Sequence, residues 1–171
     1  MRLPPLPEGF DAVFVGDNDT ADLLARAHRD FRSEASAARD ALGGGAIALC
    51  LYNGRDVAHV GWIATSLAAR RSLDRLKYEI RFDRGEAWAG AVYTVPRFRG
   101  RGLLTYSALR RFAYLRDAGF SLCRSAVETN NGASNRVQMR FEPRIYAIAH
   151  LFRLFGWRRW TERPPRPGEL P

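Results

Sequence analysis

The sequence predicts an α/β protein of the α+β type, in which a central mixed sheet has helices on both faces. Three observations lead to this fold class. Two apolar runs flank Asn53-Gly54, which is a strong signal for a β-hairpin. A third apolar run, Ala87–Val95, continues through a loop with two glycines into a helical pattern and then another apolar run. Residues with helical spacing precede the hairpin.

The first third of the chain predicts a short strand and two helices. Asp11–Val15 alternates in polarity, as a strand does. Asp19 or Thr20 is a suitable cap for a helix, and apolar residues then recur at helical spacing: Leu23, Leu24, Ala27 and Phe31. A second helix is expected from Ser33 to Leu42, and the glycines 43–45 end it.

Strands dominate the middle of the predicted fold. Ala46–Tyr52 and Val57–Thr65 form the two arms of the hairpin. Leu76–Phe82 is expected to be a further strand or a strand-like edge. Ala87–Val95 is a long strand that ends at Pro96, because proline has no N–H to donate to a ladder.

The second half of the chain predicts a helix, a strand, a short helix and a last strand. Apolar residues fall on one helical face at Leu104, Ala108, Phe112 and Leu115, and Gly119 suits the helix end. Strands are expected at Phe120–Val127 and Ile145–Phe155, with a short helix after Asn131–Ser134. Arg158–Pro171 contains four prolines and is expected to be a solvated extension. One domain over residues 1–160 with a Pro-rich tail over 161–171 accounts for the length.

Composition narrows the classes of protein and partner. The chain has 171 residues and a formal net charge of +9, which favours an anionic partner. Its two cysteines are too few for a disulfide scaffold or a Cys-rich zinc module. The three histidines are far apart and no HExxH motif occurs, so we expect no metal; His59 lies in an apolar run and is expected in the core. No run of residues is apolar enough for a membrane span or a signal peptide, so we expect a cytoplasmic protein without a membrane partner.

The segment between the long strand and the next helix predicts an anion site. It reads RFRGRG over residues 97–102, so two glycines let the backbone approach a ligand and three arginines add positive charge. The first N–H groups of a helix have no intrahelical partner, and the helix dipole adds about half a positive charge there. A phosphate or pyrophosphate is the ligand that this arrangement suits.

Two common nucleotide motifs do not describe this loop. The chain has no GxxxxGK[ST] sequence, which a Walker A loop requires. The string GRGLLT ends in Thr105 where a dinucleotide fingerprint needs a small third residue. The ligand is therefore expected to be a different phosphate compound.

The segment VYTVPRFRGRGLL resembles the signature of the GNAT superfamily of acyl-CoA-dependent N-acyltransferases, in which a strand, Pro and [Q/R]-x-x-G-x-[G/A] precede a helix. Asn131-Gly-Ala-Ser134 is similar to the family's later N-x-x-[A/S] motif. The resemblance implies a single-domain GNAT-like fold whose mixed sheet is mostly antiparallel. It implies acetyl-CoA as the acyl donor, no metal, and coenzyme contacts from Tyr93, Thr94, Val95, Arg97, Arg99, Gly100, Arg101, Gly102, Leu103, Leu104, Asn131 and Ser134.

The resemblance also implies direct attack of an amine on the thioester. Counting back from Arg97, Glu86 falls where the histone-acetylating branch of the family places its general base. Glu128 is the second candidate base, and Tyr146, with Tyr106, is a candidate acid. The family's usual tyrosine position holds Gln138, which has no titratable proton, and the usual Gly-Phe pair is replaced by Glu142-Pro143.

Three functions remain open at the sequence level. The favoured one is an N-acetyltransferase whose acceptor is a small-molecule or peptide amine, with a homodimer left open. The Gln138 departure motivates the second, a non-catalytic acyl-CoA-binding module on the same fold. The charge and the arginines among aromatic residues motivate the third and least favoured, a basic nucleic-acid-binding protein.

Overall fold

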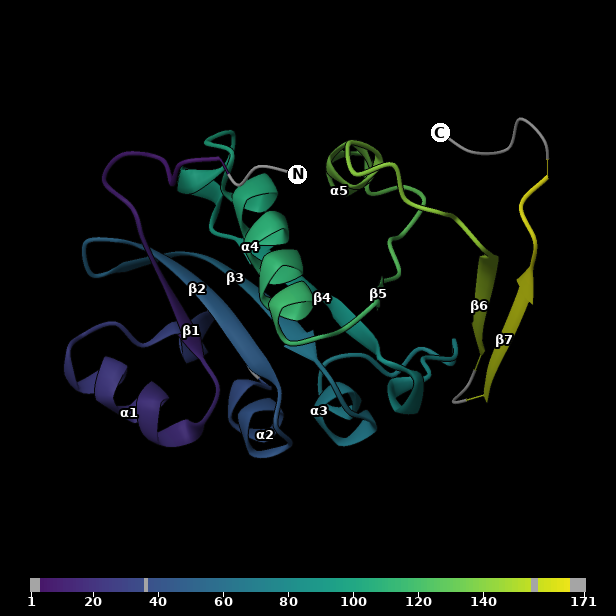
Figure 1. The fold of residues 1–171 in the computed structure, drawn as a ribbon, viewed down its shortest axis with the longest axis horizontal. Coiled ribbons are helices and arrows are strands. Elements are labelled where there is room, and N and C mark those ends of the chain that lie inside the picture. The colour runs from purple at the N-terminus through teal and green to yellow at the C-terminus, as the bar shows by residue number, and fades with distance from the viewer. Residues whose placement is uncertain (1–3, 36, 155–156, 167–171) are drawn as a thin grey trace. The chain divides into compact units, whose positions relative to one another are not determined.

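The computed structural model describes residues 4–35, 37–154 and 157–166, which form two compact units, Met1–Ala126 and Val127–Pro171. The first unit contains a five-stranded sheet, shown in Figure 1, whose strand order follows the sequence. Its first four strands are antiparallel and the last pair is parallel, which confirms the mixed, mostly antiparallel sheet. The strands are β1 (Asp11–Val15), β2 (Ile47–Asn53), β3 (Asp56–Ala64), β4 (Glu86–Thr94) and β5 (Leu122–Arg124).

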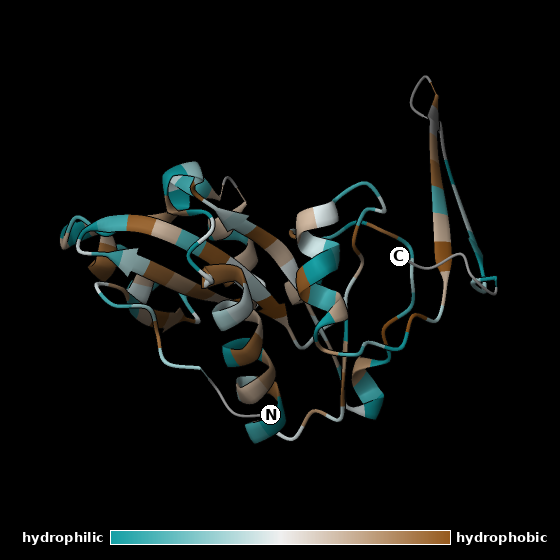
Figure 2. Ribbon diagram, turned by 90° about the horizontal axis from the view of Figure 1, so that it is seen from above, coloured by the Kyte–Doolittle hydropathy of each residue, from teal (hydrophilic) through white to brown (hydrophobic). Residues whose placement is uncertain are grey.

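Helices cover both faces of this sheet, as predicted. On one face α4 packs against β2, β3 and β4 and buries Leu103 and Tyr106 with Leu49 and Leu51. On the other face Phe31 of the 3-10 turn η1 lies against Trp62, with ring centroids 6.0 Å apart. Figure 2 shows that the strands between these layers are rich in hydrophobic residues. The helical elements are α1 (Asn18–Arg26), η1 (Phe31–Glu34), α2 (Ala38–Gly43), α3 (Leu67–Arg71), η2 (Phe82–Arg84), η3 (Pro96–Phe98) and α4 (Leu103–Asp117).

The first two predicted helices needed correction. The cap of α1 is Asp17 rather than Asp19 or Thr20, because its Oδ1 accepts the Thr20 N–H at 2.6 Å. The helix ends at Arg26, and His28 then takes a left-handed conformation with φ 60°, so Phe31 lies outside α1. The second predicted helix is split into η1 and α2.

The segment between β3 and β4 is not a strand over 76–82 as expected. Its carbonyl groups are satisfied by the buried side chain of Arg70, which donates to Leu76 O at 2.8 Å and to Tyr78 O at 3.0 Å. Because a buried side chain takes these acceptors, the segment needs no neighbouring strand. The hairpin itself is confirmed, but Asn53 pairs with Asp56, so only Gly54 of the predicted pair lies in the turn, with φ 61°.

The second unit contains α5 (Gly132–Met139) and an antiparallel pair, β6 (Ile148–Leu154) and β7 (Trp157–Arg163). The predicted short helix and last strand are thus present, although β6 begins three residues later than expected and Phe155 lies outside the described residues. The expectation of a solvated extension is wrong for residues 158–163, which belong to β7. Within the described ranges, no helix combines the length and hydropathy needed to cross a membrane.

Candidate functional site

The second half of β4 has an open edge within the first unit. β4 pairs with β3 from Trp88 to Thr94, whereas its parallel partner β5 pairs only with the segment from Glu86 to Trp88. β5 ends at Arg124. From Ala89 to Thr94, the edge of β4 away from β3 therefore has no strand of this unit beside it. The backbone N–H and C=O groups on that edge can therefore pair with a ligand, as at any open sheet edge.

A β-bulge lies in this open half. Gly90 pairs with Trp62 and Tyr93 pairs with Val60, so Ala91 and Val92 both lie opposite the single residue between those partners. Ala91 adopts a φ of +43°, which is unusual for a residue with a side chain. Tyr93 and Val92 are exposed. The bulge therefore turns the backbone of β4 at the point where its second neighbour is absent.

The loop after β4 has the backbone conformation that the predicted anion site would need. Gly100 and Gly102 have φ values of 77° and 76°, and a Cβ at either would meet no atom within 4 Å. Glycine is thus required by the backbone conformation, and the space above it stays open. Gly102 provides no side-chain cap to α4, and the first helical bond comes from the Tyr106 N–H to Gly102 O at 3.0 Å. The N–H groups of residues 103–105 have no helical acceptor and suit an anion.

The three arginines of the loop differ in their partners. Arg97 forms an ion pair with Asp56 at 3.0 Å, so its charge is largely compensated. Arg99 donates from Nε to Thr94 O at 3.1 Å, which ties the loop back to β4. No acidic side chain in the described part of the chain forms an ion pair with Arg101, which is exposed. Arg101 is therefore the arginine best placed to add charge to the anion site.

Phe98 anchors the loop in the core. Its ring is 6% exposed and meets the edge of Phe10 at a centroid distance of 5.8 Å. The Arg101 guanidinium lies 5.7 Å from the centroid of the same ring. Phe98 packs in one cluster with Leu49, Leu51, Ala58, Leu103 and Tyr106, so the candidate acid Tyr106 is a core residue at the start of α4.

A buried polar cluster lies between β3, β4 and α4. His59 is fully buried, as expected, and its Nδ1 lies 2.7 Å from Thr94 Oγ1. Burial, with a contribution from the Arg111 charge, lowers the pKa of His59 to about 3, so its ring is neutral at neutral pH. Arg111 of α4 is 2% exposed and Ser107 is fully buried. No local pattern in the sequence distinguishes Arg111 from Arg110 and Arg116, the other two arginines of α4.

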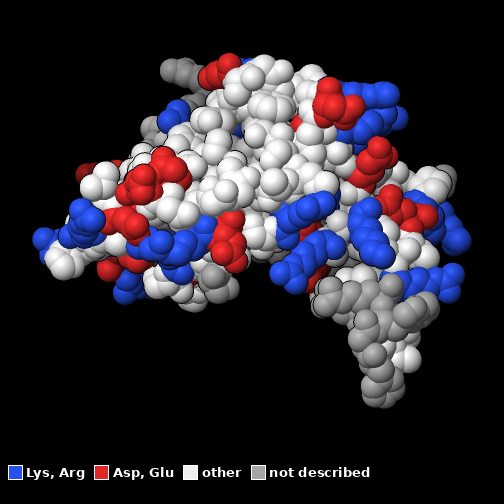
Figure 3. Space-filling view, turned by 90° about the horizontal axis from the view of Figure 1, so that it is seen from below, with Lys and Arg blue, Asp and Glu red and all other residues white. Residues whose placement is uncertain are grey.

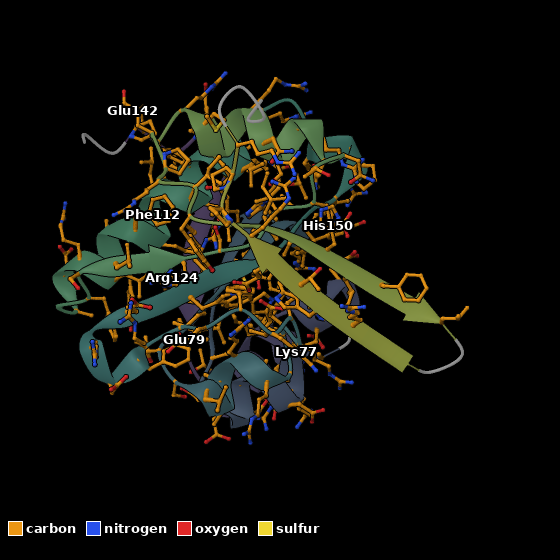
Figure 4. The ribbon with its side chains drawn as sticks, turned by 90° about the vertical axis from the view of Figure 1, so that its right-hand side faces the viewer. Lys77, Glu79, Phe112, Arg124, Glu142 and His150 are labelled. Atoms are coloured by element: carbon orange, nitrogen blue, oxygen red, sulfur yellow. The ribbon has the colours of Figure 1, made fainter. Side chains whose placement is uncertain are left out.

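Glu86 occupies the first position of β4 and is held by an ion pair. Both nitrogens Nε and Nη2 of Arg124 donate to its carboxylate, at 2.6 and 2.8 Å, and Figure 4 shows Arg124 on β5. The Arg81 N–H also donates to Glu86 Oε2 at 2.9 Å. Hydrogen bonding from Arg124 lowers the pKa of Glu86 to about 2 in spite of its burial. A carboxylate that takes a proton from an amine needs a pKa above its ordinary value, so the shift at Glu86 is in the wrong direction for a base.

The remaining predicted site residues belong to the second unit. The Asn131 side chain accepts the Ser134 N–H at 3.1 Å, so this pair caps α5. Glu128 and Tyr146 are exposed, and Gln138 lies on α5. Glu142 has φ 49°, a left-handed conformation that suits glycine, the residue the family has at this position. The coenzyme and catalytic roles of Asn131, Ser134, Glu128 and Tyr146 stay predictions.

Two further features bear on other kinds of site. A cavity of about 460 Å³ on the β6–β7 pair is lined by His150, Phe152, Arg159 and Thr161, none of which the sequence singled out for a site; Figure 4 labels His150. Among the described residues, no three His, Cys, Asp or Glu side chains are grouped as a metal would require.

Many arginines of the first unit are compensated by acids. Figure 3 shows acidic side chains among the Lys and Arg side chains on the face that it draws. Local ion pairs join Arg29 to Asp11, Arg32 to Asp22 and Asp30, and Arg39 to Asp22. A basic surface for nucleic acid therefore has less support here than the net charge suggests.

Comparisons with known proteins identify the fold. By sequence, no family model matches the chain and no curated protein matches it. Among solved structures, yncA from Salmonella typhimurium, proposed to be an acetyltransferase and solved with its cofactor acetyl-CoA, aligns at a TM-score of 0.57. It is 16% identical, over 91% of this chain and 92% of its own. Glucosamine-6-phosphate N-acetyltransferase from Arabidopsis thaliana aligns at 0.52 with 13% identity, over 86% of this chain and 99% of its own.

The chain therefore has the GNAT fold, and the resemblance that the loop motif carried is confirmed at the level of the fold. At identities of 13–16% the likeness establishes architecture and not activity.

Proposed function

We propose that this protein is an acyl-CoA-dependent N-acyltransferase that transfers an acetyl group from acetyl-CoA to a primary amine. One observation carries the proposal: the open half of β4 leads directly into a helix N-terminus that has no side-chain cap. An edge of free backbone groups followed by an anion site matches a ligand with an extended amide-containing arm and a pyrophosphate.

The residues present fit this donor along its length. The N–H groups at the start of α4, from Leu103 and Leu104 onward, would receive the pyrophosphate, and Arg101 would add charge. Gly100 and Gly102 leave the space above the loop free. The backbone of Tyr93–Val95 would run beside the pantetheine arm, although the Val95 N–H is already used by Ala58 O at 3.0 Å. Asn131 and Ser134 are proposed as further coenzyme contacts from the second unit.

The chemistry proposed is direct attack without a covalent enzyme intermediate. The ammonium group loses a proton to give the free amine, whose nitrogen forms a bond to the thioester carbonyl carbon. The C–S bond then breaks to release a thiolate, which takes up a proton as the nitrogen loses its second proton and becomes the amide. Negative charge develops on the carbonyl oxygen, and N–H groups on the open edge of β4 can stabilise it.

The base for this reaction depends on the ion pair of Glu86. While Arg124 holds both carboxylate oxygens, Glu86 accepts a proton poorly at neutral pH. A role as base requires that Arg124 moves away, and without that movement a water or Glu128 would take the proton. Gln138, at the position where the family usually has tyrosine, cannot supply a proton. Tyr146 is the proposed acid instead.

A second candidate function is binding of acyl-CoA without turnover. The low pKa of Glu86 and the glutamine at position 138 both favour it. The anion loop and the open edge of β4 are retained in this alternative, so it differs from the first only in the chemistry.

Release of free thiol from acetyl-CoA in the presence of a panel of primary amines tests the proposal. The panel should contain polyamines, amino sugars, amino acids and lysine peptides, with Gly102→Val as the control because valine opposes a φ of 76°. We expect amine-dependent thiol release that Gly102→Val abolishes. Coenzyme A binding without release under any amine would favour the second candidate, and absence of binding would overturn both.

A further inference from the structure

Arg111 is a buried arginine that pairs with backbone rather than with acids. It is 2% exposed on α4, and no carboxylate within the described residues forms an ion pair with it. Its Nη1 donates to Trp62 O at 3.1 Å and its Nε donates to Ser107 O at 3.3 Å. Burial lowers its pKa to about 10, which still leaves it charged at neutral pH. A buried charge without an acid is costly, so its retention calls for an explanation.

The side chain lies against the part of β3 that faces the bulge of β4. Trp62, whose carbonyl it contacts, pairs with Gly90 at the start of the bulge. Gly61 lies opposite the bulge, and a Cβ there would come within 3.1 Å of the Arg111 guanidinium and 3.0 Å of Ser107 Oγ. The absence of a side chain at Gly61 is thus what makes room for Arg111.

The backbone of the bulge has an unusual conformation that neighbouring contacts must stabilise. Ala91 holds a φ of +43°, and conformations of this kind persist only where the surrounding structure imposes them. On the other side of the bulge, His59 contacts Thr94 Oγ1 at 2.7 Å. His59 of β3 therefore contacts β4 just after the bulge, and Arg111 of α4 contacts β3 opposite the start of the bulge.

We propose that Arg111 is a positioning residue that holds the bulge of β4 in the conformation from which its backbone N–H groups can serve the thioester. The guanidinium acts through Trp62 O and through the space at Gly61, and it touches neither the amine nor the acyl group. This inference rests on the proposed function for its catalytic consequence, whereas its structural part stands on the bulge alone.

Arg111→Met is the informative variant, because methionine fills a similar volume without hydrogen bonds. The matched control is Arg116→Met, on the same helix, where the side chain is 70% exposed and bonds only its neighbour Asp117. We expect Arg111→Met to remain folded, since an apolar residue replaces a buried charge without an ionic partner. We expect faster amide hydrogen exchange over residues 89–94, and no change there in the control.

The catalytic consequence is measured separately. Arg111→Met should lower kcat at least ~10-fold, as loss of an oriented oxyanion donor does, while the affinity for coenzyme A is unchanged because the loop at 97–102 is intact. Gly61→Ala should reproduce both effects with Arg111 present, because its Cβ would displace the guanidinium. This second variant covers the case in which Arg111→Met fails to fold.

The outcomes separate this inference from the proposed function. Unchanged exchange over residues 89–94 in both folded variants would overturn the positioning role, whether or not the wild type turns over acetyl-CoA. Loss of kcat in proportion to a loss of thermal stability, with the bulge unaffected, would also overturn it. Faster exchange at the bulge in the variants, together with a wild-type protein that shows no turnover, would support the positioning role and count only against the proposed reaction.

Discussion

The two halves of β4 are made of similar residues but serve different purposes. In the first half, Glu86–Trp88 is buried and pairs with β5, Trp88 also pairs with Ala64 of β3, and an ion pair joins Glu86 to Arg124 of β5. In the second half, Ala89–Thr94 has a neighbour on one side only, carries a bulge and is largely exposed. Pairing with β5 is thus confined to the first half, and the second half has one edge without a strand of the first unit, where we propose that a ligand binds.

In the account proposed above, one strand combines a support for the sheet with an edge for the ligand. The ion pair of Glu86 lies where β4 and β5 are still together, and the strands part beyond Arg124. The anion loop follows the open half after only a short 3-10 turn. A ligand at the open edge would therefore be held by elements that the closed half keeps in place.

The largest effect is expected from breaking the closed half. Glu86→Gln removes the negative charge that pairs with Arg124 in a site that is mostly buried. Loss of one member of a buried pair costs about 3 kcal/mol of unfolding free energy. Denaturant unfolding at neutral pH should show this loss, and a variant as stable as the wild type would contradict the structural role of the pair.

The next effect concerns the open half and its loop. Arg101→Glu places a negative charge at the anion site, and loss of a charge-assisted contact should weaken coenzyme A binding about 10- to 100-fold. Arg84→Glu, in η2 just before β4, is the control at the opposite end of the strand. Calorimetry should separate the two variants, and equal affinities would remove the loop from the site.

Low pH should reduce stability over two different ranges, one for each half of β4. His59 of β3 contacts Thr94 in the open half, and Glu86 lies in the closed half. His59 has its pKa lowered to about 3 in the folded protein, so the unfolded chain binds its proton more readily below about pH 6.5. Stability should therefore fall as pH drops from about 6.5 toward 3, by up to ~1.4 kcal/mol per pH unit. Glu86 contributes only below its unfolded value of 4.5, as pH falls toward 2. In His59→Gln the slope between pH 6 and 5 should flatten, and an unchanged slope there would assign it to other groups.

The smallest effect compares one substitution in both halves. Ala87→Gly, in the closed half, should cost about 1–2 kcal/mol, since it removes a buried methyl group and frees the unfolded backbone. Ala91→Gly, at the bulge, should be neutral or stabilising by up to about 1 kcal/mol, because glycine adopts a positive φ without strain. Thermal unfolding of the pair tests the comparison, and losses of equal size would argue against strain at Ala91.

Local features of the site could be predicted from the sequence, whereas contacts between distant residues could not. The loop from Arg97 to Gly102 is defined by neighbours in the chain, so its glycines, its charge and the following helix were all visible. The partner of Glu86 is 38 residues away and the carbonyl that Arg111 contacts is 49 residues away. No periodicity in the sequence reports such pairs.

The errors in secondary structure have a similar origin. The segment 76–82 has a strand-like pattern, but the buried Arg70 satisfies its carbonyl groups. Arg158–Arg163 has the composition of a solvated tail, yet it pairs with β6 residue by residue. In both places the secondary structure depends on a contact with a distant residue, which local propensity does not report.

Amide hydrogen exchange of the full chain with and without coenzyme A tests the central claim most directly. The claim is that the open half of β4 and the start of α4 form the donor site. We predict protection over residues 89–106 on addition of coenzyme A, with no added protection over 86–88. Protection confined to β6 and β7, or none over residues 89–106 at a saturating concentration, would contradict the account.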